Sequence, residues 1–335
     1  MSARLIVEQA GIGVAVQDFG RTGARRLGVP VSGALDPLRL AAANVLAGAA
    51  EGAAGLEILL AAPGFYVESG PVRVGLAGAL SGRVTRADGA VQRIESFSGI
   101  TLLAGDRLAL KLARGPAYLG FSGGLHVPRF LHSRSTYARA GFGGLEGRAL
   151  RAGDALACAP GEGDVLAPPL AHESGPIRFI PGPQDAFFAP DALAVFQSAE
   201  WRVGADSDRM GMRLSGPRLA HGPRGANIVT DGATPGAIQV PGDGQPIILR
   251  ADGQTSGGYA KIGCVIAADL PRLAHFALGE ACRFRAVTHE EAGAARAQSR
   301  KNFAQWRAQI GPAPRGWDAE KLWTENLISG ATFGD

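Results

Sequence analysis

Short runs of apolar residues, each closed by glycine or proline, recur along the whole chain. Some alternate with polar positions and others are continuous, which is typical of β-strands. The pattern predicts strands over residues 5–7, 72–76, 101–112, 177–180, 247–249 and 265–266. We therefore expect a mainly β protein.

Helical patterns are few, and the clearest in the body of the chain follows Asp36-Pro37. An aspartate can cap the free amides of a helix, proline suits its first position, and Gly48 suits its end, so a helix is predicted over residues 37–47. A second, short helix is predicted over 184–196. Residues 289–309 are rich in Ala, Glu, Arg and Gln, and residues 317–328 carry large apolar side chains near helical spacing, so a helical C-terminal extension is predicted over 289–335.

Composition supports many short elements and narrows the function classes. Glycine and proline contribute 49 and 21 of the 335 residues, which favours tight turns over long helices. The 34 basic and 30 acidic residues nearly balance, and no basic cluster is interleaved with aromatics. Nucleic-acid binding is therefore not an expected function.

Several absences narrow the chemistry further. The three cysteines form no CxxC pair, which predicts a reducing, cytoplasmic location. No apolar stretch suits a signal peptide or a membrane span. The six histidines form no HxH or HExxH pattern, no lysine follows glycine as a phosphate-binding loop requires, and no Met-Lys-Met offers attachment of biotin. We expect no bound metal, no membrane contact and no biotin attached to this chain.

Two internal echoes suggest how the chain is organised. The pattern Asp-x-x-Arg-x-Gly-x-Arg-x-x-Gly begins at Asp18 and again at Asp206, and a local pairing of each aspartate with the arginine three residues later is the structural interpretation. A turn of the type Gly-Asp or Gly-Glu occurs at Gly105, Gly153 and Gly279. We predict two related β-rich domains, residues 1–165 and 166–288, followed by the extension.

The densest polar cluster lies in the second predicted domain. Gly257 and Gly258 allow backbone amides to approach a ligand, Thr255 and Ser256 add hydroxyls, and Lys261 offers an ammonium for a carboxylate or phosphate oxygen. An anionic small molecule fits this chemistry. A polar β-turn with a capping threonine is the structural alternative, and the pattern does not choose between them.

Several longer strings resemble one known family. QDFGRTGARRLGVPVSGALD, SDRMGMRLSGP, GAIQVPGDGQPI and ADGQTSGGYAKIG are similar to the biotin-dependent carboxyltransferase family, A and B subdomains. The resemblance covers about residues 4–288. It implies two cyclophilin-like β-barrel domains and a partner that carries the C and D subdomains. The family includes the C subunit of 5-oxoprolinase and urea amidolyase-related proteins.

For free-standing bacterial members the resemblance implies ATP-dependent opening of the 5-oxoproline lactam to L-glutamate, by the A, B and C subunits of 5-oxoprolinase together. It implies ATP as cosubstrate, held at a site shared with or on a partner subunit, and no activity of this chain alone. The motif positions suggest Lys261, Asp252 and Gln254 as catalytic residues, with Asp252 orienting Lys261 or taking a proton. The suggested substrate-binding residues are Arg209, Gln239, Thr255, Gly257, Gly258 and Tyr259.

Two further functions stay open at this point. A carboxyltransferase would act on urea or a similar amide with carboxybiotin supplied by another protein. A non-catalytic regulator would bind a kinase-inhibitor-like partner, and its polar cluster around Gln254 would tolerate mutation. The sequence does not decide between opening of 5-oxoproline and carboxyl transfer to urea or a similar amide.

Overall fold

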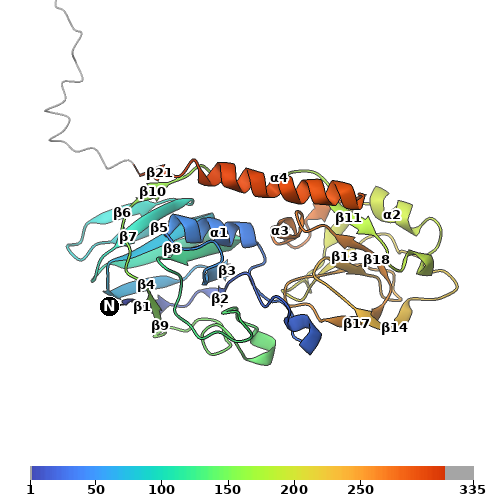
Figure 1. Ribbon diagram of the computed structural model, residues 1–335, viewed down its shortest axis with the longest axis horizontal. Coiled ribbons are helices and arrows are strands. Elements are labelled where there is room, and N and C mark those ends of the chain that lie inside the picture. The colour runs from blue at the N-terminus through green and yellow to red at the C-terminus, as the bar shows by residue number, and fades with distance from the viewer. Residues whose placement is uncertain (1, 314–335) are drawn as a thin grey trace, which may run out of the picture.

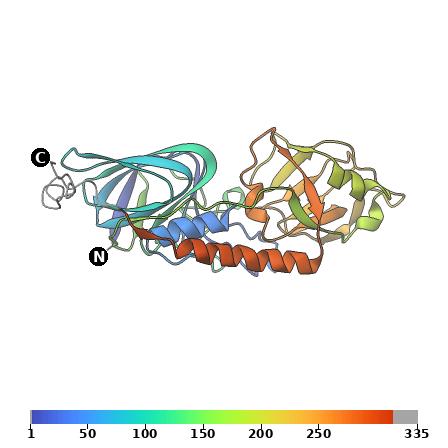
Figure 2. The same cartoon turned by 90° about the horizontal axis from the view of Figure 1, so that it is seen from above.

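The computed structural model describes residues 2–313, and its strands form two β-rich halves that lie side by side along the long axis of the molecule (Figure 1). The first half is built on an eleven-stranded sheet that curls into a nearly closed barrel (Figure 2). Its two longest strands, β5 and β8, pair antiparallel and carry the centre of the sheet. The strands of the first half are β1 (Ala3–Gln9), β2 (Ile12–Gln17), β3 (Gly55–Ala61), β4 (Gly64–Ser69), β5 (Val72–Thr85), β6 (Val91–Ile94), β7 (Ser98–Leu102), β8 (Arg107–Phe121), β9 (Ala155–Cys158), β10 (Val165–Leu166) and β21 (Gly311–Pro312).

The second half contains an eight-stranded sheet and a separate two-stranded ribbon. The large sheet covers a core of aromatic side chains, in which Phe196 stacks on Phe284 and lies against Trp201. Its strands are β11 (Ile177–Pro181), β12 (Trp201–Val203), β13 (Gly211–Ser215), β15 (Ala237–Gln239), β16 (Ile247–Leu249), β18 (Lys261–Val265), β19 (Ala281–Cys282) and β20 (Phe284–Ala286). The ribbon pairs β14 (Asn227–Gly232) with β17 (Ser256–Tyr259).

Among the described residues, two helices are longer than two turns. Helix α1 (Pro37–Leu46) begins at Asp36, whose side chain accepts hydrogen bonds from the amides of Leu38 and Arg39. Helix α4 (His289–Arg307) begins with a capping box, in which Thr288 and Glu291 each satisfy an amide of the other. The remaining helices are short: α2 (Ala192–Ser198), α3 (Leu270–Leu273) and 3₁₀ turns at Ala24–Leu27, Ala138–Ala140 and Asp185–Phe187.

Helix α4 runs along both halves (Figures 1 and 2). Near its start, Ala295 packs in a small cluster with Ile266 and Val287 of the second half. Near its end, Phe303 and Trp306 pack in the cluster that holds α1, and the Trp306 Nε1 donates to the Pro168 carbonyl at 2.8 Å. The helix therefore clamps the halves in one arrangement through apolar contacts at both ends.

Most predicted elements have counterparts. The predicted helices at 37–47 and 289–309 correspond to α1 and α4, and the strand at 247–249 matches β16. The single helix predicted over 184–196 is wrong: a 3₁₀ turn precedes α2, and Pro190 separates them because the residue before proline disfavours helical geometry. The predicted helix over 317–328 lies outside the described residues.

The repeated turn is a true structural repeat. Gly105, Gly153 and Gly279 all have φ between 78° and 91°. The acidic residue after each glycine accepts a hydrogen bond from an amide three residues before it, at 2.8, 2.7 and 2.8 Å. Because this conformation favours glycine, the Gly-Asp pattern reports backbone geometry directly.

The longer echo does not have the same structure in both places. Residues 24–27 form a 3₁₀ turn, whereas the matching positions after Arg209 begin strand β13. The expected local ion pairs are also absent among the described residues: Arg21 donates to the Ser135 carbonyl, and Arg209 binds Asp252 and Glu57. This echo therefore does not by itself indicate two related domains.

Candidate functional site

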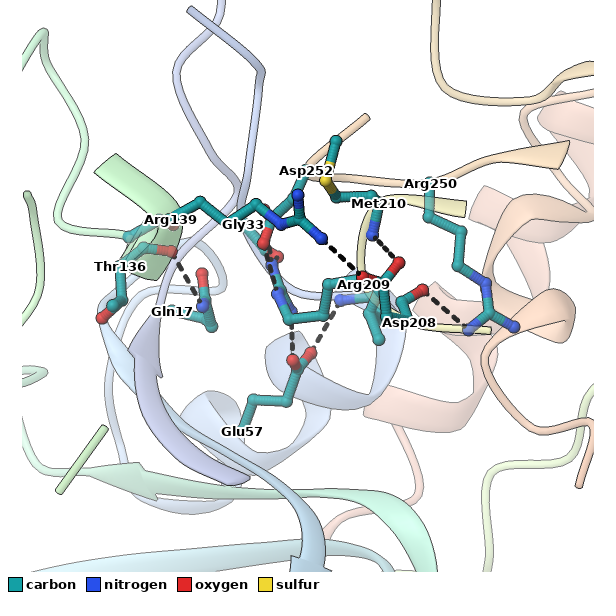
Figure 3. Close-up of polar contacts among 12 residues, drawn as sticks. Gln17, Gly33, Glu57, Thr136, Arg139, Asp208, Arg209, Met210, Arg250 and Asp252 are labelled. Carbon is teal, nitrogen blue, oxygen red and sulfur yellow. Dashed lines mark hydrogen bonds and ion pairs between the residues drawn. The ribbon is translucent and has the colours of Figure 1, made fainter. Parts of the chain in front are cut away.

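Arg209 lies between the two halves and binds carboxylates from both (Figure 3). Its Nε and Nη2 donate to the two oxygens of Asp252 at 2.9 and 3.1 Å, and its Nη1 donates to Glu57 on β3. Nη2 also donates to the Gly33 carbonyl at 2.6 Å. Burial lowers the pKa of Arg209, but the two carboxylates outweigh burial and raise it above its usual value. The guanidinium is a permanent cation fixed by four hydrogen bonds.

A buried polar chain continues from Glu57 into the first half. The Tyr118 hydroxyl donates to Glu57 Oε2 at 2.8 Å and accepts the Asp36 amide at the same distance. The Leu35 amide also donates to Glu57 Oε2, at 2.7 Å. Burial and the neighbouring Glu57 raise the pKa of Tyr118 well above its usual value, so this phenol stays protonated. The chain links Arg209 to the start of α1.

At the end of this chain, two histidines meet the buried carboxylate of Asp36. Both His172 and His275 place Nε2 at 2.7 Å from the same oxygen, Asp36 Oδ2, which is hydrogen-bond distance. The residue types suit a metal and their ligand atoms lie within 4.8 Å of one another. However, two ligands of one tetrahedral zinc ion lie about 3.3 Å apart, farther than each histidine lies from Asp36. The cluster joins α1 to the segment after α3, and its histidines line a cavity of about 390 Å³.

The predicted polar cluster of the second half is assembled on neighbouring strands. Gln239 ends β15 and faces Lys261 at the start of β18 in the sheet register. Gln254 Nε2 donates to Gln239 Oε1 at 3.2 Å. Lys261 is 4% exposed, and its ammonium donates to Asp231 Oδ2 at 3.0 Å and to the Gly232 carbonyl at 3.1 Å. Lys261 therefore anchors the ribbon to the sheet at this cluster.

Gly257 brings backbone against the Gln239 amide. A Cβ at Gly257 would lie 2.3 Å from Gln239 Nε2, so any larger residue would displace that side chain. Gln239 is 2% exposed, and its Nε2 has no hydrogen-bond partner among the described residues. A buried amide without a partner is costly unless a ligand or water satisfies it. This donor is the best evidence that the cluster accepts a polar ligand atom.

The other predicted residues lie in or beside the ribbon. The Thr255 carbonyl accepts from Ala233 at 2.9 Å, and Gly258 and Tyr259 belong to β17. Tyr259 is 42% exposed. Asp252 was expected to orient Lys261, but its carboxylate binds Arg209 and Lys261 binds Asp231 instead. Sequence alone could not distinguish these pairings because the partner of Lys261 lies 30 residues away on another strand.

Arg25 of the first half also reaches this cluster, and sequence reasoning missed it. Its Nη2 lies 3.4 Å from the carbonyls of both Gln254 and Thr255. Its Nη1 is buried without a hydrogen-bond partner among residues 2–313, and burial lowers its pKa. The sequence did contain one indication, because Arg25 is the second arginine of the repeated pattern that begins at Asp18. The interpretation of that pattern considered only its first arginines, Arg21 and Arg209. The site is thus formed by both halves.

Comparison with known proteins identifies the family of the chain. Residues 27–286 match the family model described as carboxyltransferase domain, subdomain A and B. The chain belongs to this family. It is 36% identical over 310 residues to the C subunit of 5-oxoprolinase from Escherichia coli (strain K12), covering 90% of this chain and 98% of that protein. The corresponding values for the C subunit of 5-oxoprolinase from Haemophilus influenzae are 36% over 295 residues, 86% and 91%.

A solved structure supports the same assignment. The crystal structure of the K. lactis urea amidolyase matches with a TM-score of 0.81 and 28% sequence identity over 92% of this chain. The match spans 21% of the urea amidolyase chain, so this chain corresponds to one part of that larger protein. Among residues 2–313, no helix has both the length and the apolar character needed to span a bilayer.

Proposed function

We propose that this chain is the C subunit of an ATP-dependent 5-oxoprolinase and opens the 5-oxoproline lactam to L-glutamate together with the A and B subunits. The observation that carries the proposal is the match to the corresponding E. coli protein, which extends over 98% of that protein. In this proposal the two halves are cyclophilin-like β-barrels, and the B subunit, as partner, supplies the C and D subdomains of the carboxyltransferase unit.

The reaction requires an activated amide. The lactam carbonyl resists water, so its oxygen attacks the γ-phosphorus of ATP and ADP leaves. Water then adds to the carbonyl carbon, and the C–N bond breaks as the nitrogen takes a proton, which leaves an acyl phosphate on the opened chain. A second water hydrolyses this acyl phosphate to the carboxylate of L-glutamate and inorganic phosphate. Negative charge develops on oxygen in these steps, and fixed donors that need no reorganisation stabilise it.

The described residues provide such donors at the Gln239 cluster. The unpartnered Gln239 Nε2 and the Arg25 Nη1 offer N–H groups to a substrate oxygen. Gln254 holds Gln239 in place, and Gly257 leaves room for close approach. Lys261 acts as a positioning residue, because its ammonium is committed to Asp231 and Gly232.

ATP belongs to this proposal as a cosubstrate. The chain has no glycine-lysine phosphate loop, so we assign the ATP site to a partner subunit or to its contact with this chain. Equilibrium binding of a fluorescent ATP analogue to this chain, to the partners and to the complex locates it. Tight binding to this chain alone would overturn that assignment.

The decisive experiment is reconstitution. The chain is mixed with its two partner subunits, and ATP hydrolysis and L-glutamate are measured with and without 5-oxoproline. We expect both products only in the complete complex with 5-oxoproline present. A complete, folded complex that forms no glutamate would overturn the proposal.

Two variants test the site in that complex. Gln254→Ala and Lys261→Ala should each lower turnover at least tenfold while the chain stays folded, because each disturbs the Gln239 cluster. Matched controls are Gln298→Ala and Lys301→Ala on the exposed face of α4, which should retain full activity. Full activity in both site variants would remove this cluster from the mechanism.

A second function is favoured by a separate observation, the TM-score of 0.81 to the urea amidolyase structure. In that function the chain would contribute to carboxyl transfer from carboxybiotin, supplied by another protein, to urea or a similar amide. Urea-dependent consumption of carboxybiotin by the complex, without formation of glutamate from 5-oxoproline, would support it over the first proposal.

A further inference from the structure

A cavity of about 200 Å³ lies between the two halves, lined by residues of both. One wall comes from the segment 31–37 of the first half, and the opposite wall comes from residues 249–251 and α3 with its flanks. The Ser32 amide donates to the Ala251 carbonyl at 2.8 Å across the cavity edge. A volume of this size is below the range typical for drug-sized ligands and suits a small metabolite.

Most of the wall is apolar, with Leu35, Leu249, Leu270 and Leu273 among the lining residues. Two polar side chains interrupt it, Arg250 and Ser32. Such a lining excludes strongly hydrated solutes and accepts a small ring that carries one charged group. The polar atoms therefore decide which ring is accepted.

Arg250 is a cation without a carboxylate partner. Its Nη1 lies 3.4 Å from the Asp208 carbonyl and its Nη2 donates to the Leu273 carbonyl, while no ion pair joins it to an acid among the described residues (Figure 3). Its Nε is buried and has no hydrogen-bond partner within residues 2–313. Burial lowers the pKa of Arg250 to about 10, which leaves it charged at neutral pH. By contrast, Arg209 in the same region binds two carboxylates.

Ser32 supplies a second unsatisfied group in the same cavity. It is 3% exposed, and its Oγ has no hydrogen-bond partner in the part of the chain that the structure describes. Its backbone has φ of 53°, a left-handed conformation that a serine rarely adopts. Strained backbone of this kind is concentrated at binding and catalytic sites.

We propose that this cavity binds the carboxylate-bearing ring of the substrate, with Arg250 pairing with the carboxylate and Ser32 hydrogen-bonding to it. This inference rests on the proposed function, in which the substrate is 5-oxoproline, a five-membered lactam with one carboxylate. A guanidinium presents a planar fork of N–H donors that matches a carboxylate. The apolar wall packs on the ring methylenes.

The test compares two ligands and three forms of the complete complex. Binding of 5-oxoproline and of neutral pyrrolidin-2-one is measured by calorimetry for the wild type, Arg250→Met and Ser32→Ala. We expect Arg250→Met to weaken 5-oxoproline binding at least tenfold and Ser32→Ala to weaken it a few-fold, while pyrrolidin-2-one binding changes little in either. Arg250→Lys should recover only part of the affinity, because lysine keeps the charge and loses the fork.

Arg283→Met is the matched control, since Arg283 is exposed and does not line the cavity. It should bind 5-oxoproline like the wild type. If Arg250→Met and Ser32→Ala both fold and bind 5-oxoproline like the wild type, the cavity proposal is overturned even where the complex hydrolyses ATP with 5-oxoproline.

A third ligand separates this inference from the proposed function. Cyclopentanecarboxylate has the ring and the carboxylate but no lactam. If the wild-type complex lacks 5-oxoproline-dependent activity but binds cyclopentanecarboxylate in an Arg250-dependent manner, the cavity stands as a cyclic-carboxylate site and the proposed function falls. If neither carboxylate binds the wild type, the cavity proposal falls.

Discussion

Arg21 and Arg209 occupy the same position of one repeated pattern, yet they bind different kinds of partner in the two halves. Arg21 is fully buried, donates to the Ser135 carbonyl and lies over the Phe142 ring at 4.9 Å, all within the first half. Arg209 binds Asp252 in its own half and also Glu57 in the other. The comparison teaches that a shared pattern of residue types does not determine the partners of a long side chain.

The two aspartates of the echo differ as well. Asp18 binds the hydroxyls of Ser133 and Ser135 and the Arg134 amide, at 2.7, 2.5 and 2.6 Å. It therefore needs no arginine. Asp206 has no such network among the described residues, and the acid that binds Arg209 in the second half is Asp252, 43 residues later. Asp18 is therefore satisfied within the first half, whereas Arg209 binds Asp252 in its own half and Glu57 in the other.

The largest expected effect comes from removing Arg209, whose ion pairs with Glu57 and Asp252 form a buried joint between the two halves. Arg209→Met should lower the free energy of unfolding by about 3–5 kcal/mol, because it leaves Glu57 and Asp252 buried without their cation. Urea denaturation followed by circular dichroism measures the change. Glu57→Gln in the same background should recover part of the loss, and an unaltered urea midpoint for Arg209→Met would contradict the role of this joint.

Arg21→Met should cost less, about 2 kcal/mol. It removes a charged hydrogen bond and the contact with the Phe142 ring, but leaves no carboxylate unpaired because Asp18 is satisfied by serines and backbone. The same urea experiment ranks the two variants. A cost equal to or above that of Arg209→Met would break the comparison.

Acid should lower the free energy of unfolding through the cluster of Asp36, His172 and His275. Burial lowers the pKa of His275 below its ordinary 6.5 despite the Asp36 carboxylate, while Arg39 and His172 also disfavour its protonation. The unfolded chain therefore takes up a proton as pH falls below about 6.5 and the folded chain does not, so stability is lost on acidification toward the folded pKa. The pKa of Asp36 is also held below its usual value, which extends the loss below about pH 4.

The measurement is the urea midpoint at pH 7.5 and 5.5. We expect a lower midpoint at 5.5 in the wild type, a smaller decrease in His275→Gln, and the wild-type decrease in the exposed control His289→Gln. Equal pH dependence in His275→Gln and the wild type would exclude His275 as the cause.

The smallest effect is expected at the surface between the halves. Arg139 of the first half lies 3.3 Å from Asp208 of the second, with both side chains at least half exposed. Arg139→Gln should therefore change stability by less than about 0.5 kcal/mol. A loss comparable to that of Arg209→Met would show that exposed contacts, rather than the buried joint, hold the halves together.

Part of the site was predictable and part was not. The glycines at 257 and 258 and the amides of Gln239 and Gln254 were marked by their motif, and the sheet register brings Gln239 and Lys261 together. Arg25, Ser32 and Arg250 were not selected, because an arginine or serine is common on any surface. Their significance arises from burial and from the missing partner, which no pattern of residue types contains.

What the sequence determined by itself is local. Asp36 and Pro37 begin α1, Thr288 and Glu291 begin α4, and the Gly-Asp turns adopt left-handed glycine geometry, because each depends on neighbours within a few residues. Only the tertiary structure decided that Arg209 would meet Glu57, 152 residues away, and that Arg250 would face a cavity without an acid. A guanidinium can reach in many directions, and the packing of the two halves decides whether it meets carboxylates, as Arg209 does, or a cavity, as Arg250 does.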